Sequence, residues 1–297
     1  MSWPEGFRSG IVAVVGRPNV GKSTLVNALV GQKIAIVSNK PQTTQRDIRA
    51  IWNTEGAQIV FTDTPGYHKP KTLLGVRLND LVSDAVDGVD LVVLVVDAAA
   101  GVGTGDAFVY REKVAQAGAP AICVVNKVDA VRGRAELPEL LAAAKLGSFD
   151  EIVPRSAKLG RGVGLLRDLI VQRLPEGPPL YPSEDVTDQS MESRLAELVR
   201  EQALHVTHQE VPHSIAVVIE EMVRDEGLVK IHASLIVERD SQKGIVIGHG
   251  GATLKKIGTR AREEMELLLG TKVYLDLRVK VLKEWQRDPK ALERLGF

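Results

Sequence analysis

Short apolar runs alternate with segments of helical periodicity along the first 175 residues. The runs are rich in valine and isoleucine, which is typical of strands buried on both faces of a sheet. They span residues 11–15, 59–62, 91–96, 121–125 and 151–154. Because helix-like segments separate them, the pattern predicts an α/β domain with a mostly parallel sheet and helices on both faces.

The pattern changes near residue 175. Residues 174–190 contain four prolines and no periodicity, so we predict a semi-rigid linker. A helical run, two strand-like runs, two helical runs and a last strand follow it, which predicts an α+β fold. The proposed organisation is a first domain over 1–175, a linker over 176–190 and a second domain over 191–297.

Composition narrows the classes of function. The chain has 297 residues, of which 44% are hydrophobic, and this excludes a disordered protein. The formal net charge is zero, so any nucleic-acid surface must be local. The single cysteine, Cys123, lies in an apolar run and is expected in the core. With no disulfide framework, signal peptide or membrane-length apolar run, we expect a cytoplasmic protein.

The segment Gly16–Ser23 reads G-x-x-x-x-G-K-S and lies between a strand-like run and a helical run. Gly16 and Gly21 allow a tight turn whose N–H groups point toward an anion. Lys22 is expected to reach the β- and γ-phosphates of a nucleotide, and the Ser23 hydroxyl to bind Mg²⁺. The spacing therefore predicts a P-loop.

Two further segments are suited to sense a γ-phosphate. Thr43 and Thr44 lie in a polar loop, where a hydroxyl can join Mg²⁺ while the γ-phosphate is present, and we prefer Thr44. Asp63 ends a strand-like run and suits Mg²⁺ through water. In the same D-T-P-G motif, Gly66 can offer its N–H to the γ-phosphate. We expect Thr44 and Gly66 to act in catalysis together with Lys22.

The motif N-K-V-D, at residues 126–129, identifies the base. The Asp129 carboxylate can accept hydrogen bonds from N1–H and the exocyclic amine of guanine, whereas adenine has no donor at N1. Asn126 is expected to brace the loop, and the Lys127 stem to cover the ring. Ser156–Lys158 can present backbone N–H groups to the guanine carbonyl.

The ordered motifs GRPNVGKS, DTPG, NKVD and SAK resemble those of the translational GTPase-like superfamily of P-loop proteins. The resemblance covers residues 10 to about 175 and implies GTP hydrolysis with Mg²⁺. The nucleotide-binding positions that match are Gly16, Arg17, Pro18, Asn19, Val20, Gly21, Lys22, Ser23, Thr24, Thr43, Thr44, Asp63, Thr64, Pro65, Gly66, Asn126, Lys127, Asp129, Ser156, Ala157 and Lys158. The implied metal ligands are Ser23, Thr44 and Asp63.

One departure from the Ras-like pattern concerns hydrolysis. Tyr67 stands where Ras-like proteins carry the glutamine that orients the attacking water, so we expect slow intrinsic turnover. His68 is a candidate substitute. Members that lack this glutamine and carry asparagine in the P-loop resemble potassium-stimulated GTPases, and Asn19 is the matching position for K⁺.

In the second domain, Gly248–Gly251 forms G-H-G-G before a helical run. Five Lys or Arg and no acid occur from Ser241 to Arg262, a local basic stripe. The element order, the glycine loop and the stripe resemble a type II KH domain, which implies single-stranded RNA held along a groove. The expected RNA-binding residues are Lys243, Ile247, Gly248, His249, Gly250, Gly251, Lys255 and Lys256.

The pairing of both domains resembles the Era-like family of bacterial ribosome-assembly GTPases over essentially the whole chain. The resemblance implies binding to the 3′ end of 16S ribosomal RNA, a role in maturation of the small (30S) ribosomal subunit, and a peripheral inner-membrane pool beside the cytoplasmic one. We expect a monomer in which GTP favours RNA binding and hydrolysis lowers it.

Two alternatives remain open. The first is a constitutive RNA-binding scaffold with a structural nucleotide domain, which Tyr67 favours. The second is a GTPase of tRNA modification, which should carry a catalytic cysteine or a cofactor fingerprint, whereas residues 190–297 contain no cysteine. The histidines show no metal-ligand spacing and are interpreted as structural or solvated. Those considered are His205, His208, His213 and His232.

Overall fold

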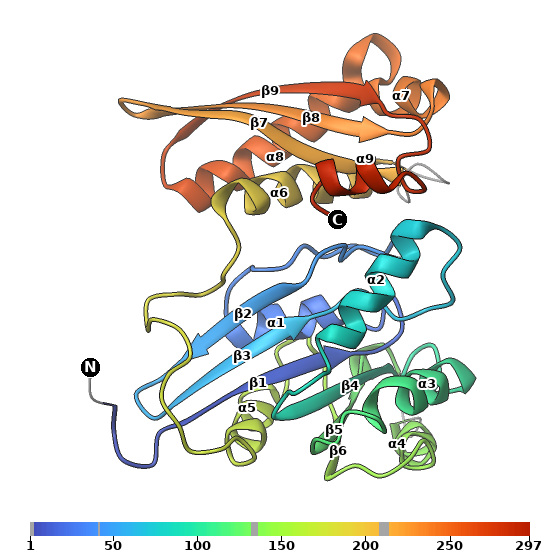
Figure 1. Cartoon of the computed structure of the whole chain (residues 1–297), viewed down its shortest axis with the longest axis vertical. Helices are drawn as coiled ribbons and strands as arrows, with labels where there is room; N and C mark the ends of the chain where they lie inside the picture. The colour runs from blue at the N-terminus through green and yellow to red at the C-terminus, as the bar shows by residue number, and fades with distance from the viewer. Residues whose placement is uncertain (1–2, 41, 132–135, 208–213) are drawn as a thin grey trace. The chain divides into compact units, whose positions relative to one another are not determined.

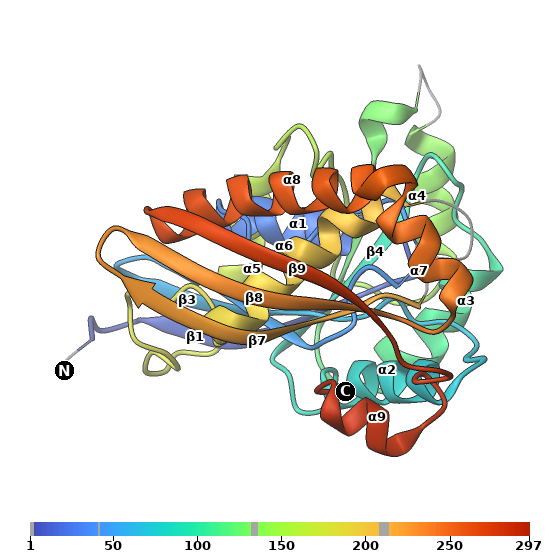
Figure 2. The ribbon, with the colours of Figure 1, turned by 90° about the horizontal axis from the view of Figure 1, so that it is seen from above.

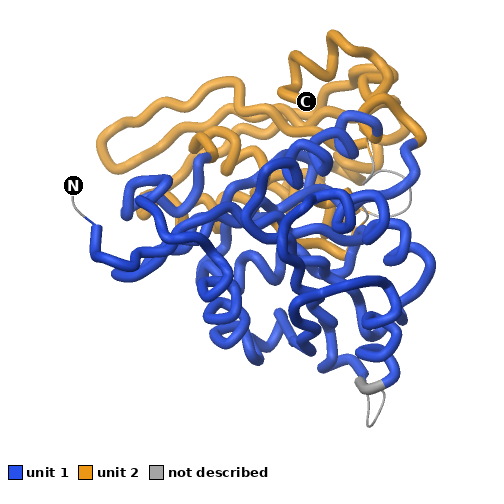
Figure 3. The backbone as a smooth tube through the Cα atoms, turned by 60° about the horizontal axis from the view of Figure 1, so that its bottom comes forward, with its two compact units in different colours: residues 1–35, 44–70, 76–188 blue, residues 36–43, 71–75, 189–297 orange. Residues whose placement is uncertain are grey.

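The computed structural model describes residues 3–40, 42–131, 136–207 and 214–297. They divide into two compact units (Figure 3). Unit 1 contains residues 1–35, 44–70 and 76–188, and unit 2 contains residues 36–43, 71–75 and 189–297. Two short segments of the first half of the chain thus belong to the C-terminal unit. His208 and His213 lie outside the described residues.

Unit 1 is built on one six-stranded sheet with the strand order β2-β3-β1-β4-β5-β6 (Figure 1). All neighbouring pairs are parallel except β2 and β3. Its strands are β1 (Arg8–Val15), β2 (Ile48–Asn53), β3 (Ala57–Asp63), β4 (Leu91–Asp97), β5 (Ala121–Asn126) and β6 (Glu151–Pro154). The mostly parallel α/β sheet predicted from the apolar runs is confirmed.

Helices connect these strands. They are α1 (Lys22–Val30), α2 (Leu73–Asp84), α3 (Thr104–Val109), the π-helical turn η1 (Tyr110–Val114), the 3₁₀ turn η2 (Val128–Ala130), α4 (Glu136–Ala144) and α5 (Val163–Val171). Helices were expected from the sequence directly after the P-loop, over residues 71–80 and over residues 162–175, and they are present as α1, α2 and α5. The antiparallel edge strand β2 and the helices α3 and α4 were not predicted.

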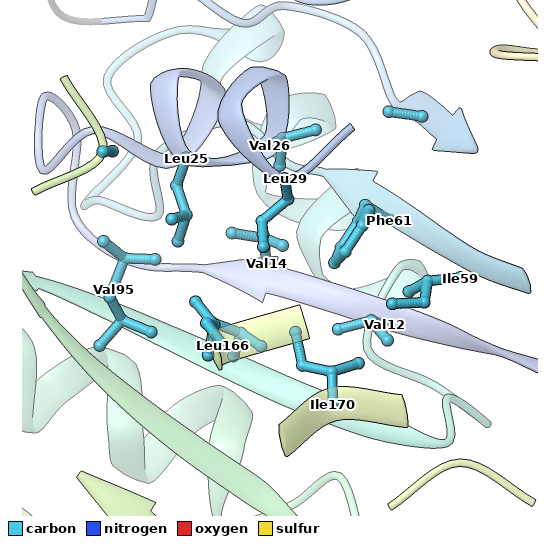
Figure 4. Close-up of a cluster of buried hydrophobic side chains, with 14 of the residues drawn as sticks. Val12, Val14, Leu25, Val26, Leu29, Ile59, Phe61, Val95, Leu166 and Ile170 are labelled. Carbon is cyan, nitrogen blue, oxygen red and sulfur yellow. The ribbon is translucent and has the colours of Figure 1, made fainter. Parts of the chain in front are cut away.

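Alternate residues of each buried strand enter two separate cores. In β1, Val12 and Val14 belong to the core beneath α1 and α5, and Figure 4 shows Leu25 and Leu29 of α1 and Ile170 of α5 in the same cluster. Ala13 and Val15 of β1 lie instead in the core of the opposite face, together with the buried Cys123. A strand buried on both faces shows no polar alternation, which is why these runs are wholly apolar.

Unit 2 contains a three-stranded sheet of order β7-β8-β9 (Figure 2). β7 and β8 are antiparallel, and β8 and β9 are parallel. Its elements are α6 (Met191–Val206), β7 (Ala216–Asp225), β8 (Leu228–Val237), α7 (Asp240–Ile247), the 3₁₀ turn η5 (His249–Gly251), α8 (Ala252–Leu269), β9 (Lys272–Val281) and α9 (Pro289–Arg294). The predicted α-β-β-α-α-β order is present, and α9 is an addition.

The segment predicted as a linker is tied to unit 1 over much of its length. The N–H of Ser9 donates to Pro175 O, and that of Gly177 donates to Phe7 O. Further along, Gln58 accepts the backbone N–H of Leu180 through its side-chain oxygen. These bonds fix residues 175–180 beside the start of β1 and on Gln58 of β3.

Candidate nucleotide site and nucleic-acid groove

The P-loop connects β1 to the first turn of α1. Gly21 precedes the helix with φ 99°, in the left-handed region that favours glycine. A Cβ atom there would lie 2.4 Å from Nδ2 of Asn126, and this amide nitrogen donates to Val20 O at 3.0 Å. Both the backbone angle and the approach of Asn126 therefore require glycine at this position.

Lys22 is buried at the start of α1. Its ammonium donates to Gly16 O at 3.1 Å and to Arg17 O at 3.0 Å, which holds it against the loop. Burial lowers the pKa of Lys22 to about 8, and the nearby Asp63 opposes this shift. A charge kept in this position is suited to phosphate oxygens.

Arg17 anchors the outer side of the P-loop. Its Nε donates to Oδ1 of the fully buried Asp106 at 2.8 Å, and its Nη2 donates to Gly101 O at 3.2 Å. The loop is therefore tied to α3 and to the segment that precedes it. Such anchoring keeps the backbone N–H groups of the loop in place before a nucleotide binds.

Three oxygen-bearing side chains converge beside the P-loop. The hydroxyl oxygens of Ser23 and Thr44 are 3.0 Å apart, and Thr44 Oγ1 donates to Asp63 Oδ2 at 3.4 Å. Asp63 Oδ1 is buried and has no hydrogen-bond partner within the described residues. Burial raises the pKa of Asp63 to about 6. A hard cation fits this set, because it would satisfy the orphaned carboxylate oxygen.

Only one of the two candidate threonines lies in this cluster. The Thr43 hydroxyl donates to Lys40 O at 2.7 Å and lies 2.7 Å from Ser38 Oγ. Thr43 thus stabilises its own loop, while Thr44 faces Ser23. The sequence could not separate the two, because adjacent residues in an irregular loop have no fixed period.

The D-T-P-G segment lies directly on the P-loop. The Thr64 hydroxyl donates to Val14 O at 2.9 Å, and the N–H of Tyr67 donates to Gly16 O at 3.3 Å. A Cβ atom on Gly66 would lie 2.6 Å from both Cα and N of Pro18. Since these are backbone atoms, no side chain fits at Gly66 unless one of the two loops moves.

Gly66→Ala is expected to lower the rate of GTP hydrolysis about 100-fold, because a displacement near 1 Å at a reacting centre costs about that factor. GDP affinity should change little, since the segment shifts away from the γ-phosphate position. Single-turnover hydrolysis and GDP titration measure the two quantities. Gly56→Ala is the matched control, because a Cβ atom there meets nothing within 4 Å. Hydrolysis at the wild-type rate in Gly66→Ala would contradict this expectation.

Tyr67, at the position of the Ras-like glutamine, is packed rather than free. Its ring stacks on Phe108 with centroids 5.5 Å apart, and the Lys113 ammonium lies 4.6 Å from its centroid. The neighbouring His68 places Nδ1 3.1 Å from Gly66 O. The side chain of His68 therefore contacts Gly66 of the D-T-P-G motif, whereas the ring of Tyr67 packs on Phe108.

The base-recognition motifs are joined to the P-loop by side chains. Ala157 N donates to Asn126 Oδ1 at 3.1 Å, and Ser156 Oγ donates to Asp129 Oδ1 at 2.5 Å. Lys127 Nζ donates to Asn19 O at 2.6 Å and to Asp97 Oδ2 at 2.7 Å. Asp97 was not predicted, although an acidic residue at the end of a buried strand was a signal that could have identified it.

The glycine loop of unit 2 is closed on one side and open on the other. A Cβ atom on Gly248 would lie 2.2 Å from Thr253 Oγ1, so this residue packs on α8. Gly250 has φ 56° and ψ 22°, and a Cβ atom there meets nothing within 4 Å. The loop therefore has room for a ligand at Gly250, whereas at Gly248 the packing against Thr253 requires glycine.

A groove of about 420 Å³ runs between α8 and the edge strand β9. Leu254, Leu275 and Leu277 give it apolar walls, while Lys255 and Arg262 contribute positive charge. Its full lining is Gly251, Leu254, Lys255, Gly258, Thr259, Arg262, Leu275, Asp276 and Leu277. Apolar walls with basic edges suit unstacked bases and a phosphate backbone.

The predicted RNA-binding residues divide around this groove. Gly251 and Lys255 line it, and Gly248, His249 and Gly250 form the adjoining loop. Lys243, Ile247 and Lys256 belong to α7 and α8 but are outside the lining. The contribution of β9 was not predicted, since it depends on which strand lies at the edge of the sheet.

The remaining candidates have structural partners. His232 Nδ1 lies 3.1 Å from Asp276 Oδ2, and His205 Nε2 lies 3.0 Å from Val37 O. Across the described part of the chain, no group of three His, Cys, Asp or Glu side chains could hold a metal ion. The helices described there are also too short or too polar to cross a membrane.

Comparison with known proteins agrees with both halves of this description. A family model for 50S ribosome-binding GTPases matches residues 11–127, and a KH domain model matches residues 210–286. GTPase Era of Mycolicibacterium smegmatis is 52% identical over 296 residues, covering 98% of this chain and 99% of that protein. GTPase Era of Mycobacterium tuberculosis is 51% identical over 297 residues, with the same coverage.

Solved structures show the same likeness. Era in complex with MgGDPNP and nucleotides 1506–1542 of 16S ribosomal RNA has a TM-score of 0.94 and 39% identity, covering 98% of this chain and 99% of that one. A variant of Aquifex aeolicus Era bound to GDP and AlF4⁻ gives the same values. The predicted fold class, GTPase activity and family resemblance are confirmed: the chain belongs to the Era family of GTPases.

Proposed function

We propose that this GTPase is a nucleotide-controlled RNA-binding protein that acts on the 3′ end of 16S ribosomal RNA during maturation of the small ribosomal subunit. The observation that carries the proposal is the whole-chain likeness to Era in complex with MgGDPNP and 16S ribosomal RNA. The open Gly250 loop beside a groove with apolar walls and basic edges supports it.

The nucleotide half of the proposal assigns roles to the converging side chains. Ser23, Thr44 and Asp63 would hold Mg²⁺, directly or through water, and the ion neutralises charge on the β- and γ-phosphates when bound. Lys22 would pair with the same phosphates, and the N–H of Gly66 would donate to the γ-phosphate. Asp63 must be deprotonated to serve, and its pKa of about 6 permits this at neutral pH. The other P-loop residues bind through their backbone N–H groups.

Asn19 is the proposed K⁺ position. It has φ 64° within the P-loop, and its carbonyl oxygen already accepts the Lys127 ammonium. A monovalent cation at Asn19 would stabilise negative charge that develops on the phosphates during hydrolysis, in a site where Tyr67 replaces the water-orienting glutamine.

We also retain the expectation of a monomeric protein of the cytoplasm with a peripheral membrane pool, on the family resemblance alone.

The RNA half of the proposal assigns the phosphate backbone to the Gly248–Gly251 loop. Lys255 and Arg262 contribute counter-charge, and the apolar walls accept bases. His249 and Lys256 are exposed near the loop, and Lys243 extends the basic stripe along α7. Asp276 lines the groove and pairs with His232 and Arg278 through Oδ2, so its Oδ1 would be the atom that accepts hydrogen bonds from exocyclic amines of bases.

The test is RNA affinity in three states of the full chain: with a GTP analogue, with GDP and without nucleotide, at one fixed salt concentration. The probe is a single-stranded RNA matching the 3′ end of 16S ribosomal RNA. We expect tight binding with the analogue and at least 10-fold weaker binding with GDP. Gly250→Asp should abolish RNA binding, because it places a carboxylate against the phosphates. The variant should fold, because Asp tolerates this backbone conformation.

Equal RNA affinity in all three states would reject nucleotide control. It would favour the second candidate, a constitutive RNA-binding scaffold. The packing of Tyr67 on Phe108 is the observation that favours this candidate, because the side chain after Gly66 then cannot orient water. Hydrolysis that stays negligible with K⁺ and small ribosomal subunits present would support the scaffold further.

A further inference from the structure

The loop that precedes Thr44 belongs to unit 2, although it lies in the first half of the chain. Residues 36–43 form part of that unit, while Thr44 starts the next segment of unit 1. A single peptide bond therefore separates a residue of the RNA-binding unit from a side chain of the proposed Mg²⁺ site. A displacement of Thr43 by several ångströms must move Thr44 as well, because consecutive Cα atoms are fixed at about 3.8 Å.

Arg200 of α6 binds the last residue of this loop. Its guanidinium pairs with Glu197 through two bonds, Nε to Oε1 at 2.8 Å and Nη2 to Oε2 at 2.6 Å. Nη2 also donates to Thr43 O. Arg200 is only 2% exposed, and its Nη1 has no hydrogen-bond partner in the described part of the chain.

Two further side chains on the same helix bind the start of the loop. Glu201 Oε1 accepts the N–H of Val37 at 2.9 Å. One turn later, the Nε2–H of His205 donates to Val37 O at 3.0 Å. Positions four apart on a helix lie on one face, so Glu201 and His205 bind both backbone groups of a single residue.

We propose that Arg200, Glu201 and His205 form a backbone clamp that holds Val37 and Thr43 and so positions Thr44 for the Mg²⁺ that accompanies GTP. They are positioning residues, because they act through the loop backbone and not on the nucleotide. The inference deepens the proposed function and rests on it, since it names the element of the RNA-binding unit that responds to GTP.

The clamp helix is continuous with the RNA-binding core. Leu195 and Val199 of α6 pack in the same buried cluster as Ile257 and Ala261 of α8, and α8 starts directly after the Gly248–Gly251 loop. If Thr44 were released from Mg²⁺ and drew Thr43 away, Arg200 would lose an acceptor in a buried position. Such a loss is costly, so the loop and α6 have a preferred joint arrangement. By linkage, RNA that favours this arrangement must favour GTP equally.

The decisive variant is Arg200→Met, which keeps the bulk of the side chain and removes the donors. We expect GTP-analogue affinity to fall about 10-fold and the Mg²⁺ concentration needed for it to rise, whereas GDP affinity changes less than twofold. The ratio of RNA affinities between the analogue and GDP states should fall by the same factor. Arg194→Met is the control, because Arg194 lies on the same helix but before the three clamp residues.

His205→Ala provides a second variant of low risk to folding, because His205 is exposed. It should lower the affinity for the GTP analogue about threefold, since one of the clamp contacts is lost. The clamp would be overturned if Arg200→Met and His205→Ala both fold and bind the GTP analogue as tightly as the wild type. The ratio of RNA affinities between the analogue and GDP states would then also equal that of the wild type. A second outcome separates the two proposals: the wild type binds RNA equally with the GTP analogue and with GDP, yet Arg200→Met still weakens binding of the analogue. In that case the proposed function is wrong and the positioning role of Arg200 stands.

Discussion

Asp129→Asn is expected to lower the affinity for GTP and GDP by roughly 10⁴-fold, because a site built to pair polar groups rejects a mismatched partner by about that factor. The Asp129 carboxylate is expected to accept hydrogen bonds from N1–H and the exocyclic amine of guanine. An asparagine amide would place an N–H₂ donor against one of these donors. Ser156 Oγ already orients Asp129 Oδ1 at 2.5 Å, so the side chain cannot easily turn away.

The same substitution should create affinity for xanthine nucleotides. Xanthine keeps N1–H but carries a carbonyl in place of the exocyclic amine, and the asparagine amide can pair with both groups. Displacement of a bound fluorescent nucleotide by GDP and by XDP measures the two affinities and shows whether the preference for GDP has changed to one for XDP. Asp87→Asn, which changes an exposed carboxylate after α2, should leave both affinities unchanged. Unaltered preference for GDP over XDP in Asp129→Asn would show that another residue reads the base.

The sequence was most informative where local chemistry dictates structure. Gly21, Lys22 and Ser23 lie at the start of α1 as predicted, because a strand, a glycine turn and a helix follow one another in the chain. The apolar runs predicted five of the six strands of unit 1. Strand β2 was missed because Arg49 and Asn53 interrupt its apolar character, as is common for an edge strand.

Contacts between distant residues were beyond sequence reasoning. The clamp joins Val37 to Glu201 across 164 positions, and Lys127 reaches Asn19 across 108 positions. Neither pair has a local pattern, since each depends on how whole elements pack. The walls that β9 gives to the RNA groove were missed for the same reason: pairing order, not the strand itself, places Leu275 and Leu277 beside α8.

Lys22→Met should reduce GTP hydrolysis by about 10²–10³-fold, the usual cost of removing one donor from a charge-stabilising site. The fold should survive. The ammonium is buried, and its desolvation opposes the bonds it makes to Gly16 O and Arg17 O, so an apolar chain of similar length replaces it at little cost. The melting temperature of the nucleotide-free protein should therefore stay level or rise, which separates lost chemistry from lost structure.

The pH dependence of GTP binding gives this substitution its sharpest test. Burial lowers the pKa of Lys22 to about 8 in the free protein, whereas phosphate oxygens stabilise its protonated form. Above pH 8 the wild type must take up a proton to bind, so its affinity should fall up to tenfold per pH unit. This decline should vanish in Lys22→Met and persist in Lys145→Met, which changes an exposed lysine. A decline that persists in Lys22→Met would assign the titration to another group, and the pairing of Lys22 with phosphate would lose its support.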